Sequence, residues 1–322
     1  MFPLAQEVGG TEIAWNRSKG EREAKFFQIG SSMVFNDNID YRQMKATLAR
    51  IYDATVLDKF VASIYGTHNN YEAVTLQGLR HGMIKKLEDA NIYGDYTYPE
   101  VSGVEEPDGL HAWAYDAGAG TGGGTGTDTQ TANASLDIDE GEGALSIQNL
   151  RELEDAMKYG IDVLLVPFQI GRRIDAFFTG AGVGPTDNRP AIGSYMWSQN
   201  DMIGMRVPHW NGIPILRSDY LVAEEANTGV GSNRRAKHST GTAQYSIFAI
   251  KFGQVRENNP GLTLGFGGKD NAEGELFRLD YFDKLETRDG SGMRLVGYFN
   301  LMAGSSMSVG RIRDITDSAV TL

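Results

Sequence analysis

The chain contains no cysteine, and this absence excludes several kinds of chemistry. Without thiols the protein forms no disulfide, no thiolate-bound metal centre and no cysteine nucleophile. The sequence also lacks an apolar run of the roughly 18 residues that a bilayer-spanning helix needs. Its start, MFPLAQEVGG, has no basic region followed by an apolar stretch, which is the pattern of a signal peptide. We therefore expect a protein that is soluble and intracellular when it is made, with no membrane partner.

The sequence has fewer basic than acidic residues. The 30 lysines and arginines are outnumbered by 42 aspartates and glutamates, which gives a formal net charge of -12. This acidity argues against tight binding to a phosphate backbone or to an anionic membrane. Hydrophobic residues make up 41% of the 322 residues, so the chain is able to bury a sizeable core as one large unit or two closely joined ones.

Signals of catalysis are scarce as well. The histidines show no metal-ligand spacing, so we predict surface or packing roles for His68, His81, His111, His209 and His238. No G-x-S-x-G motif is present, and the two GSSM segments are typical of turns. The glycine-rich stretch 117–143 lacks the Gly-Lys-Ser/Thr of a phosphate-binding loop, and its DIDEGEG segment favours a solvated acidic loop over a calcium site. We expect no catalytic residue, no cofactor and no metal.

Residues 11–29 predict a polar hairpin. Thr11, Ile13 and Trp15 alternate with polar or small residues, which is the period of a strand. A turn at 18–20 and a return strand rich in charge would follow. Both arms are polar on much of both faces, and such a ribbon is not stable alone. Two interpretations stay open: an ordinary solvated hairpin, or an extended arm that lies on a neighbouring subunit.

The next segments predict helices. Apolar residues at helix-like spacing indicate one or two helices within 40–66. A clearer apolar stripe over 71–95 predicts a long amphipathic helix that stops at Gly94. Its internal Gly78 and Gly82 weaken the helix but permit close approach of another backbone.

The second half of the chain predicts an α/β module followed by strands. Ser146 is a suitable N-cap for a helix that we expect to end at Gly160, and 162–167 reads as a buried strand. Pro167 opens a further helix. From residue 195 the pattern is that of strands, with Asn211-Gly212 as a strong hairpin turn and Asp289-Gly290 as turn residues before the last long strand.

Two pairs of basic residues stand out in this acidic chain. Arg234 and Arg235 lie in a polar loop, which favours either plain solvation or contact with an acidic neighbour or nucleic acid. Arg172 and Arg173 lie on a predicted helix and are candidates for ion pairs between subunits, although exposed ion pairs contribute little.

The order of these elements resembles a known family. The helix–strand–helix run SIQNLRELEDAMKYGIDVLLVPFQIGRRIDAFF is followed by WNGIPILRSDYL, YSIFAIKFG and GLTLGFGG. The closing hairpin FRLDYFDKLETRDGSGMRLVGYFNLMAGSSMSVGRIRDI and the NIYGD after the long helix also fit. Together, over about residues 10–315, these segments resemble major capsid proteins of tailed double-stranded DNA viruses with the Hong Kong 97-type fold.

The resemblance implies an α+β fold with named parts. A short N-terminal segment and the E-loop hairpin would occupy 1–45, and the peripheral domain with its spine helix 46–98 and 275–322. The axial domain would occupy 99–274. Because the chain begins almost at the hairpin, the family's N-terminal arm would be very short or removed. Some relatives cross-link subunits through an isopeptide bond, for which Lys19 or Lys25 and Asn300 are the candidates here.

The resemblance also implies a function. We expect a major capsid protein, not an enzyme, that forms hexamers and pentamers of an icosahedral head. The head would enclose double-stranded DNA by weak contact, carry a portal and possible decoration or scaffolding proteins, and assemble in the host cytoplasm into the virion. Candidate inter-subunit contacts are Trp15, Arg17, Lys19, Arg22, Lys25, Arg172, Arg173, Arg234 and Arg235. Three alternatives stay open: an encapsulin-like compartment, a soluble hydrolase with a carboxylate pair, and a viral tail or adhesion protein.

Overall fold

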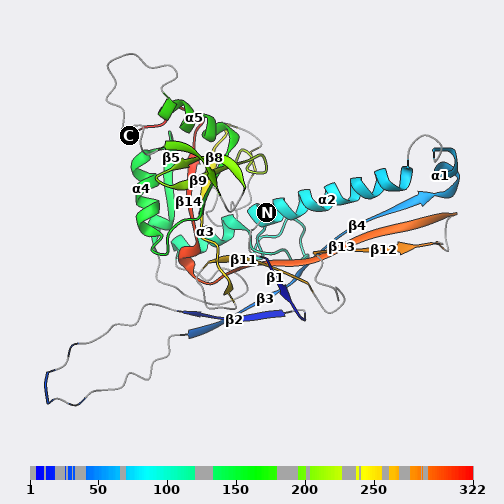
Figure 1. The fold of residues 1–322 in the computed structure, drawn as a ribbon, viewed down its shortest axis with the longest axis horizontal. Coiled ribbons are helices and arrows are strands. Elements are labelled where there is room, and N and C mark those ends of the chain that lie inside the picture. The colour runs from blue at the N-terminus through cyan, green and yellow to red at the C-terminus, as the bar shows by residue number, and fades with distance from the viewer. Residues whose placement is uncertain are drawn as a thin grey trace.

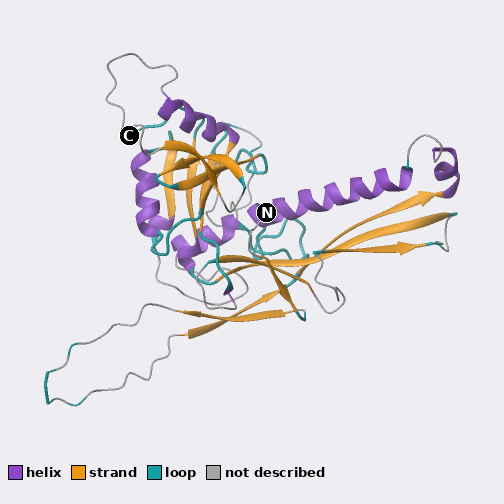
Figure 2. Ribbon diagram, in the orientation of Figure 1, coloured by secondary structure: helices purple, strands orange, loops and turns teal. Residues whose placement is uncertain are grey.

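Two β-sheets, a two-stranded ribbon and one long helix organise the chain (Figures 1 and 2). The structure is a computed structural model, and the residues it describes are 5–10, 12–18, 26, 28–30, 32, 41–65, 70–119, 133–179, 195–200, 204–226, 237–238, 241–255, 261–267, 276–283, 285 and 289–321. A body built around the larger sheet lies at one end, and a long arm extends away from it.

The seven-stranded sheet forms the body. Its strands, in spatial order, are β5 (Asp137–Gly143), β14 (Val309–Ile315), β10 (Tyr245–Ile250), β6 (Val163–Pro167), β9 (Ile213–Ser218), β8 (Met205–Trp210) and β7 (Tyr195–Asn200). Side chains alternate between its faces, so Leu164 and Val166 pack with α4 (Ile147–Ala156) and α5 (Phe168–Thr179). Val163 and Phe248 instead pack with α3 (Leu110–Ala119) and the end of the long helix. Both faces of the central strands are therefore buried.

The five-stranded sheet carries the arm. Its central strand, β13 (Gly290–Ala303), pairs along one edge with β4 (Ala49–Asp58). Along the other edge it pairs first with β12 (Phe277–Phe282) and then with β11 (Leu262–Gly267), which in turn pairs with β1 (Ala5–Val8). The helix α2 (Tyr71–Tyr93) runs along β4 and β13, and the short α1 (Lys59–Tyr65) closes the tip (Figure 1). Leu57, Leu79 and Met293 form the core of this arm.

The prediction of helices within 40–66 is wrong for most of that segment. Residues 41–58 form β3 (Tyr41–Thr47) and β4, and only 59–65 is helical. Exposure alternates along β4, where Arg50, Tyr52 and Val56 are exposed while Leu57 is buried. Each residue of β4 pairs with one of β13. This long-range pairing decides the structure, because strand preference depends on the partner more than on local spacing.

The N-terminal ribbon pairs two strands that lie far apart in the sequence. β2 (Glu12–Ser18) confirms the strand around Trp15, but its partner is β3, with Ser18 opposite Tyr41. The turn and the charged return strand expected after Ser18 lie almost entirely outside the described residues. The sequence favoured a short hairpin because Ser18-Lys19-Gly20 has turn composition, whereas the pairing partner lies more than twenty residues further along the chain.

Several local signals are confirmed. α2 ends where Gly94 donates its amide to the Ala90 carbonyl (2.9 Å), and the Ser146 side chain caps α4 by accepting from the Gln148 amide. Asn211 and Gly212 both have positive φ, at 51° and 83°, as a two-residue hairpin turn requires. α4 ends at Ala156, before the predicted stop at Gly160.

The acidic segment 137–143 is not a loop. It forms β5, which lies parallel to β14 with Ile138 opposite Ile312. Arg311 bonds to Asp137 at 2.8 Å and Arg313 to Asp139 at 2.8 Å. The two arginines compensate the charges of Asp137 and Asp139. Because both arginines lie far along the sequence, the segment considered alone was predicted to be a solvated loop.

Candidate assembly surfaces

A buried network of polar side chains ties the body together. The Glu224 carboxylate accepts from Nε2 of His111 (2.7 Å) and from the Ser246 hydroxyl (2.6 Å). Nδ1 of His111 lies 2.8 Å from Nη1 of Arg311. The Tyr93 ring packs against His111 in a tilted arrangement, with centroids 4.8 Å apart, and the Tyr93 hydroxyl donates to Glu224 at 3.2 Å. Glu224, which lies between β9 and β10, is thereby linked to residues of α2, α3, β10 and β14, so the network joins α2 and α3 to the seven-stranded sheet.

The pKa values of the buried groups in this network are shifted by burial and by their neighbours in the fold. Burial alone would raise the pKa of Glu224, but His111, Arg311 and the Ser246 hydroxyl outweigh it and lower the pKa to about 2. Burial and the neighbouring carboxylate raise the pKa of Tyr93 well above its ordinary value. Glu224 and His111 have side-chain exposures of only 1%. The predicted packing role of His111 is thus confirmed, whereas no sequence signal marked Glu224 as its partner.

The arm exposes an unusual amount of apolar surface. Tyr52 and Phe60 are 73% and 71% exposed. The same arm, made of β4, α1, the start of α2 and β12, exposes further large apolar side chains, and together we call this set the arm patch: Tyr52, Val56, Phe60, Ile64, Val74, Leu279, Tyr281 and Phe282. Concentrated apolar exposure of this kind marks an interaction surface in soluble proteins.

One face of the arm also carries an ordered charge cluster. Asp280 accepts from Arg278 (3.0 Å) within β12 and from Arg294 (2.7 Å) on the adjacent β13. These two guanidinium groups lower the pKa of Asp280. Arg294 also lies over the Phe282 ring, with its Cζ 5.4 Å from the centroid. The edge of the arm therefore presents fixed charges beside apolar side chains.

The ribbon is fastened to the rest of the chain at its root. The Trp15 indole donates to the Ala303 carbonyl (3.2 Å) and packs with Met44, Leu48 and Met302. The Asn300 amide donates to the Thr47 carbonyl (2.7 Å), where β3 gives way to β4. These contacts hold the ribbon across the five-stranded sheet (Figure 1).

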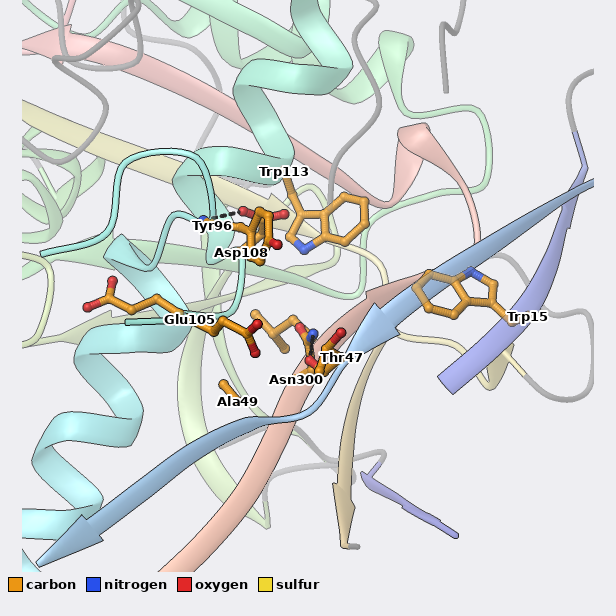
Figure 3. Close-up of a pocket in the computed structure, with 10 residues that line it drawn as sticks. Trp15, Thr47, Ala49, Tyr96, Glu105, Asp108, Trp113 and Asn300 are labelled. Carbon is orange, nitrogen blue, oxygen red and sulfur yellow. Dashed lines mark hydrogen bonds between the residues drawn. The ribbon is translucent and has the colours of Figure 1, made fainter. Parts of the chain in front are cut away.

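A cavity of about 20 Å³ lies beside this root. Figure 3 shows Trp15 and Asn300 on its ribbon side, with Trp113 and Asp108 on the opposite side. Asp108 accepts from the Tyr96 amide (2.8 Å). The space suits about one water molecule, not a substrate. Of its two indole side chains, Trp15 packs in the cluster at the ribbon root, and Trp113 packs in the cluster that joins α2 and α3 to the sheets.

The predicted contact residues fall into three groups. Trp15 is buried within its own chain, and Arg17 lies on β2 opposite Arg42. Arg172 and Arg173 both pair with Asp317 of the same chain, at 3.2 and 2.7 Å. The remaining candidates lie outside the described residues: Lys19, Arg22, Lys25, Arg234 and Arg235. Contact with a neighbouring subunit stays a prediction for all nine, as does a cross-link of Asn300 to Lys19 or Lys25.

In the part of the chain that the structure describes, no group of three or more histidine and acidic side chains is arranged to hold a metal ion. None of the helices found there is long and apolar enough to cross a membrane.

Comparison with known proteins identifies the fold. The chain matches no protein-family model and no curated protein. Among solved structures it is similar to the SrpI encapsulin complex of Synechococcus elongatus PCC 7942, with a TM-score of 0.61 at 13% identity over 99% of this chain and 88% of that one. It is also similar to the capsid of a native GTA particle, with a TM-score of 0.60 at 12% identity, covering 97% and 89% of the two chains.

A third similar structure is the capsid of the cyanophage P-SCSP1u, with a TM-score of 0.54 at 8% identity over 96% of this chain and 85% of that one. These identities establish the fold alone. The chain therefore has the Hong Kong 97-type fold that phage capsids and encapsulins share, as the sequence predicted. The division into E-loop, peripheral and axial domains by residue number stays a prediction. By sheet membership, β14 groups with the body and β11 with the arm.

Proposed function

We propose that this protein is a shell subunit that assembles with copies of itself into a closed container. The observation that carries the proposal is the arm patch: a single chain exposes Tyr52, Phe60 and Ile64 on a projecting element that its own body does not cover. The fold shared with capsids and an encapsulin supports the same conclusion.

The physical argument rests on burial of apolar surface. Covering such side chains contributes about 25 cal/mol for each Å² removed from water. A specific interface between proteins usually buries roughly 1,200–2,000 Å² in total. The arm and the ribbon both extend from the body, so one copy is able to contact several neighbours at once. Many modest contacts then add up to a stable shell.

The specific form we propose is a viral major capsid protein. Hexamers and pentamers would close an icosahedral head around double-stranded DNA, with a portal and with decoration or scaffolding proteins as further partners. The net charge of -12 suits a wall that does not adhere to packaged DNA. In this form the protein would assemble in the host cytoplasm and remain in the virion.

A second form is supported by the similarity to the SrpI encapsulin, whose TM-score of 0.61 equals or exceeds those of the capsids named above. In this form the container would enclose protein cargo. The described residues favour neither form over the other. The contents of the particle distinguish them.

The hydrolase alternative has less support. It needs a solvent-reached pair of carboxylates with one raised pKa. In the described part of the chain, the carboxylates with a resolved shift are Glu224 and Asp280, and both have a lowered pKa. Glu224 is also fully buried.

The test is expression of the chain alone, followed by size-exclusion chromatography and negative-stain microscopy. Closed shells, capsomers or tubes support the proposal, and a stable monomer at high concentration contradicts it. Nuclease treatment and mass spectrometry of particles from the native source then separate nucleic acid contents from protein cargo.

A further inference from the structure

The strand β12 lies on an outer edge of the arm. It pairs with β13 along one side, and the described strands include none that pairs with its other side. An edge strand presents backbone N–H and C=O groups that suit pairing with a further strand. Leu279 and Tyr281 are opposite the buried Leu295 and Met293. They therefore project to the face that α2 covers, yet they remain 44% and 51% exposed at the edge.

The sequence of this strand is complementary to itself in antiparallel alignment. When two copies are aligned about Leu279, each Arg278 lies opposite an Asp280 of the other copy. Each Phe277 lies opposite a Tyr281, and the two Leu279 side chains meet at the centre. Opposite charges and aromatic pairs are the cross-strand neighbours that stabilise an antiparallel pair.

The side chains are already ordered for this pairing. Arg278 bonds to Asp280 within the strand (3.0 Å), and Arg294 holds the same carboxylate from β13 (2.7 Å). A second copy would place its own Arg278 and Asp280 opposite in reversed order, which gives alternating charges on one face of the sheet. On the other face, Leu279 and Tyr281 would lose their exposure to water.

We propose that the β12 edges of two copies join as antiparallel strands about a two-fold axis at Leu279. The occupant of this edge is thus a second copy of the chain, and the inference rests on the proposed function as a shell subunit. The two arms would form one continuous sheet. A two-fold contact uses the same patch on both partners, which is what a self-complementary strand provides. Closed icosahedral shells contain two-fold axes where such contacts fit.

The natural absence of cysteine allows a direct test. Residues directly opposite in an antiparallel pair have Cα atoms about 4.5–5.5 Å apart, within the range of about 4.4–6.8 Å that a disulfide spans. The variant Leu279→Cys should therefore form a covalent dimer on mild oxidation, seen on a non-reducing gel. Because Leu279 is 44% exposed, the change leaves the fold intact.

The matched control is Tyr281→Cys, which is similarly exposed on the same strand and face. In the proposed register its counterpart in the other copy is offset by four residues, roughly 13 Å along the strand, which is too far for a disulfide. We expect at least tenfold more dimer from Leu279→Cys. A double variant, Phe277→Cys with Tyr281→Cys, should regain the dimer because these two positions face each other across the axis.

Microscopy of the same samples separates the two proposals. Particles without a Leu279→Cys dimer in excess of the control overturn the β12 contact and leave the shell function standing. A dimer without particles supports the β12 contact and counts against the shell function. If neither particles nor an excess of the Leu279→Cys dimer form, both the β12 contact and the shell function are overturned. Equal amounts of covalent dimer from Leu279→Cys and Tyr281→Cys overturn the proposed register, since random collision of the subunits would then explain the dimer.

Discussion

Nδ1 of His111 lies 2.8 Å from Nη1 of Arg311, with both side chains almost completely buried. Because a guanidinium group only donates, Nδ1 is the acceptor and the ring carries its proton on Nε2. Nε2 then donates to Glu224 at 2.7 Å. One arginine thereby fixes the orientation of a histidine that joins α3 to the segment before β10.

Replacing Glu224 by glutamine should destabilise the protein strongly. The amide keeps the size of the side chain but removes the charge that faces His111 and Arg311. Removal of one partner from a buried ionic network typically costs about 3–5 kcal/mol. Urea unfolding should show this loss. The control Asp317→Asn breaks exposed pairs with Arg172 and Arg173 and should cost at most about 1 kcal/mol. Equal effects of the two changes would contradict the structural role of the network.

The same carboxylate predicts a pH dependence. The pKa of Glu224 is lowered in the folded protein from 4.5 to about 2, because His111 and Arg311 outweigh the effect of burial. A group with a lowered pKa stabilises the fold fully above its unfolded pKa, and this contribution is lost as pH falls toward the folded value. Stability from Glu224 should therefore decline between about pH 4.5 and pH 2. The measurement is urea unfolding across this range, where Glu224→Gln should show a flatter pH profile than the natural protein.

Local signals in the sequence predicted several elements of the body and the long helix of the arm. Ser146 caps its helix through its own side chain, and Asn211-Gly212 adopts positive φ within two residues. The stripe of α2 is also local, and its Leu79, Met83 and Leu87 are buried as expected. Each of these features depends on residues only a few positions apart, so single-sequence patterns were sufficient.

The features that the sequence did not predict depend on partners that are far apart along the chain. β4 is a strand because β13 lies beside it, more than two hundred residues later. β5 is a strand beside β14, where Arg311 and Arg313 pair with its Asp137 and Asp139. For the assembly surfaces, the sequence predicted the strand of Trp15 but not its burial, because its hydrogen-bond acceptor, Ala303, is 288 positions away. The arm patch was not predicted, because exposure depends on which face the tertiary fold leaves uncovered.

Truncation of Trp15 should release the ribbon from the five-stranded sheet. Trp15→Ala removes both the packing with Met44 and Met302 and the hydrogen bond to Ala303, and such changes typically cost about 3–5 kcal/mol. Trp15→Phe keeps most of the packing and should cost about 0.5–1.5 kcal/mol for the lost hydrogen bond. Chemical unfolding measures both values. Assembly, followed by light scattering, should fail for Trp15→Ala only, and normal assembly of that variant would contradict the anchoring role.

Replacing Phe60 by serine should impair assembly without destabilising the subunit. Phe60 is 71% exposed at the tip of the arm, so its contacts within the chain are few and the unfolding free energy should change by less than about 0.5 kcal/mol. If the arm patch is covered by a neighbour in the shell, the lost apolar burial recurs at every subunit, and the concentration needed for assembly should rise at least tenfold. The matched control is Phe168→Ser on α5, which is 52% exposed but lies outside the arm patch. Light scattering against protein concentration gives the assembly threshold for both variants. An unchanged threshold for Phe60→Ser, or the same shift for Phe168→Ser, would show that the tip of the arm is not a specific contact between subunits.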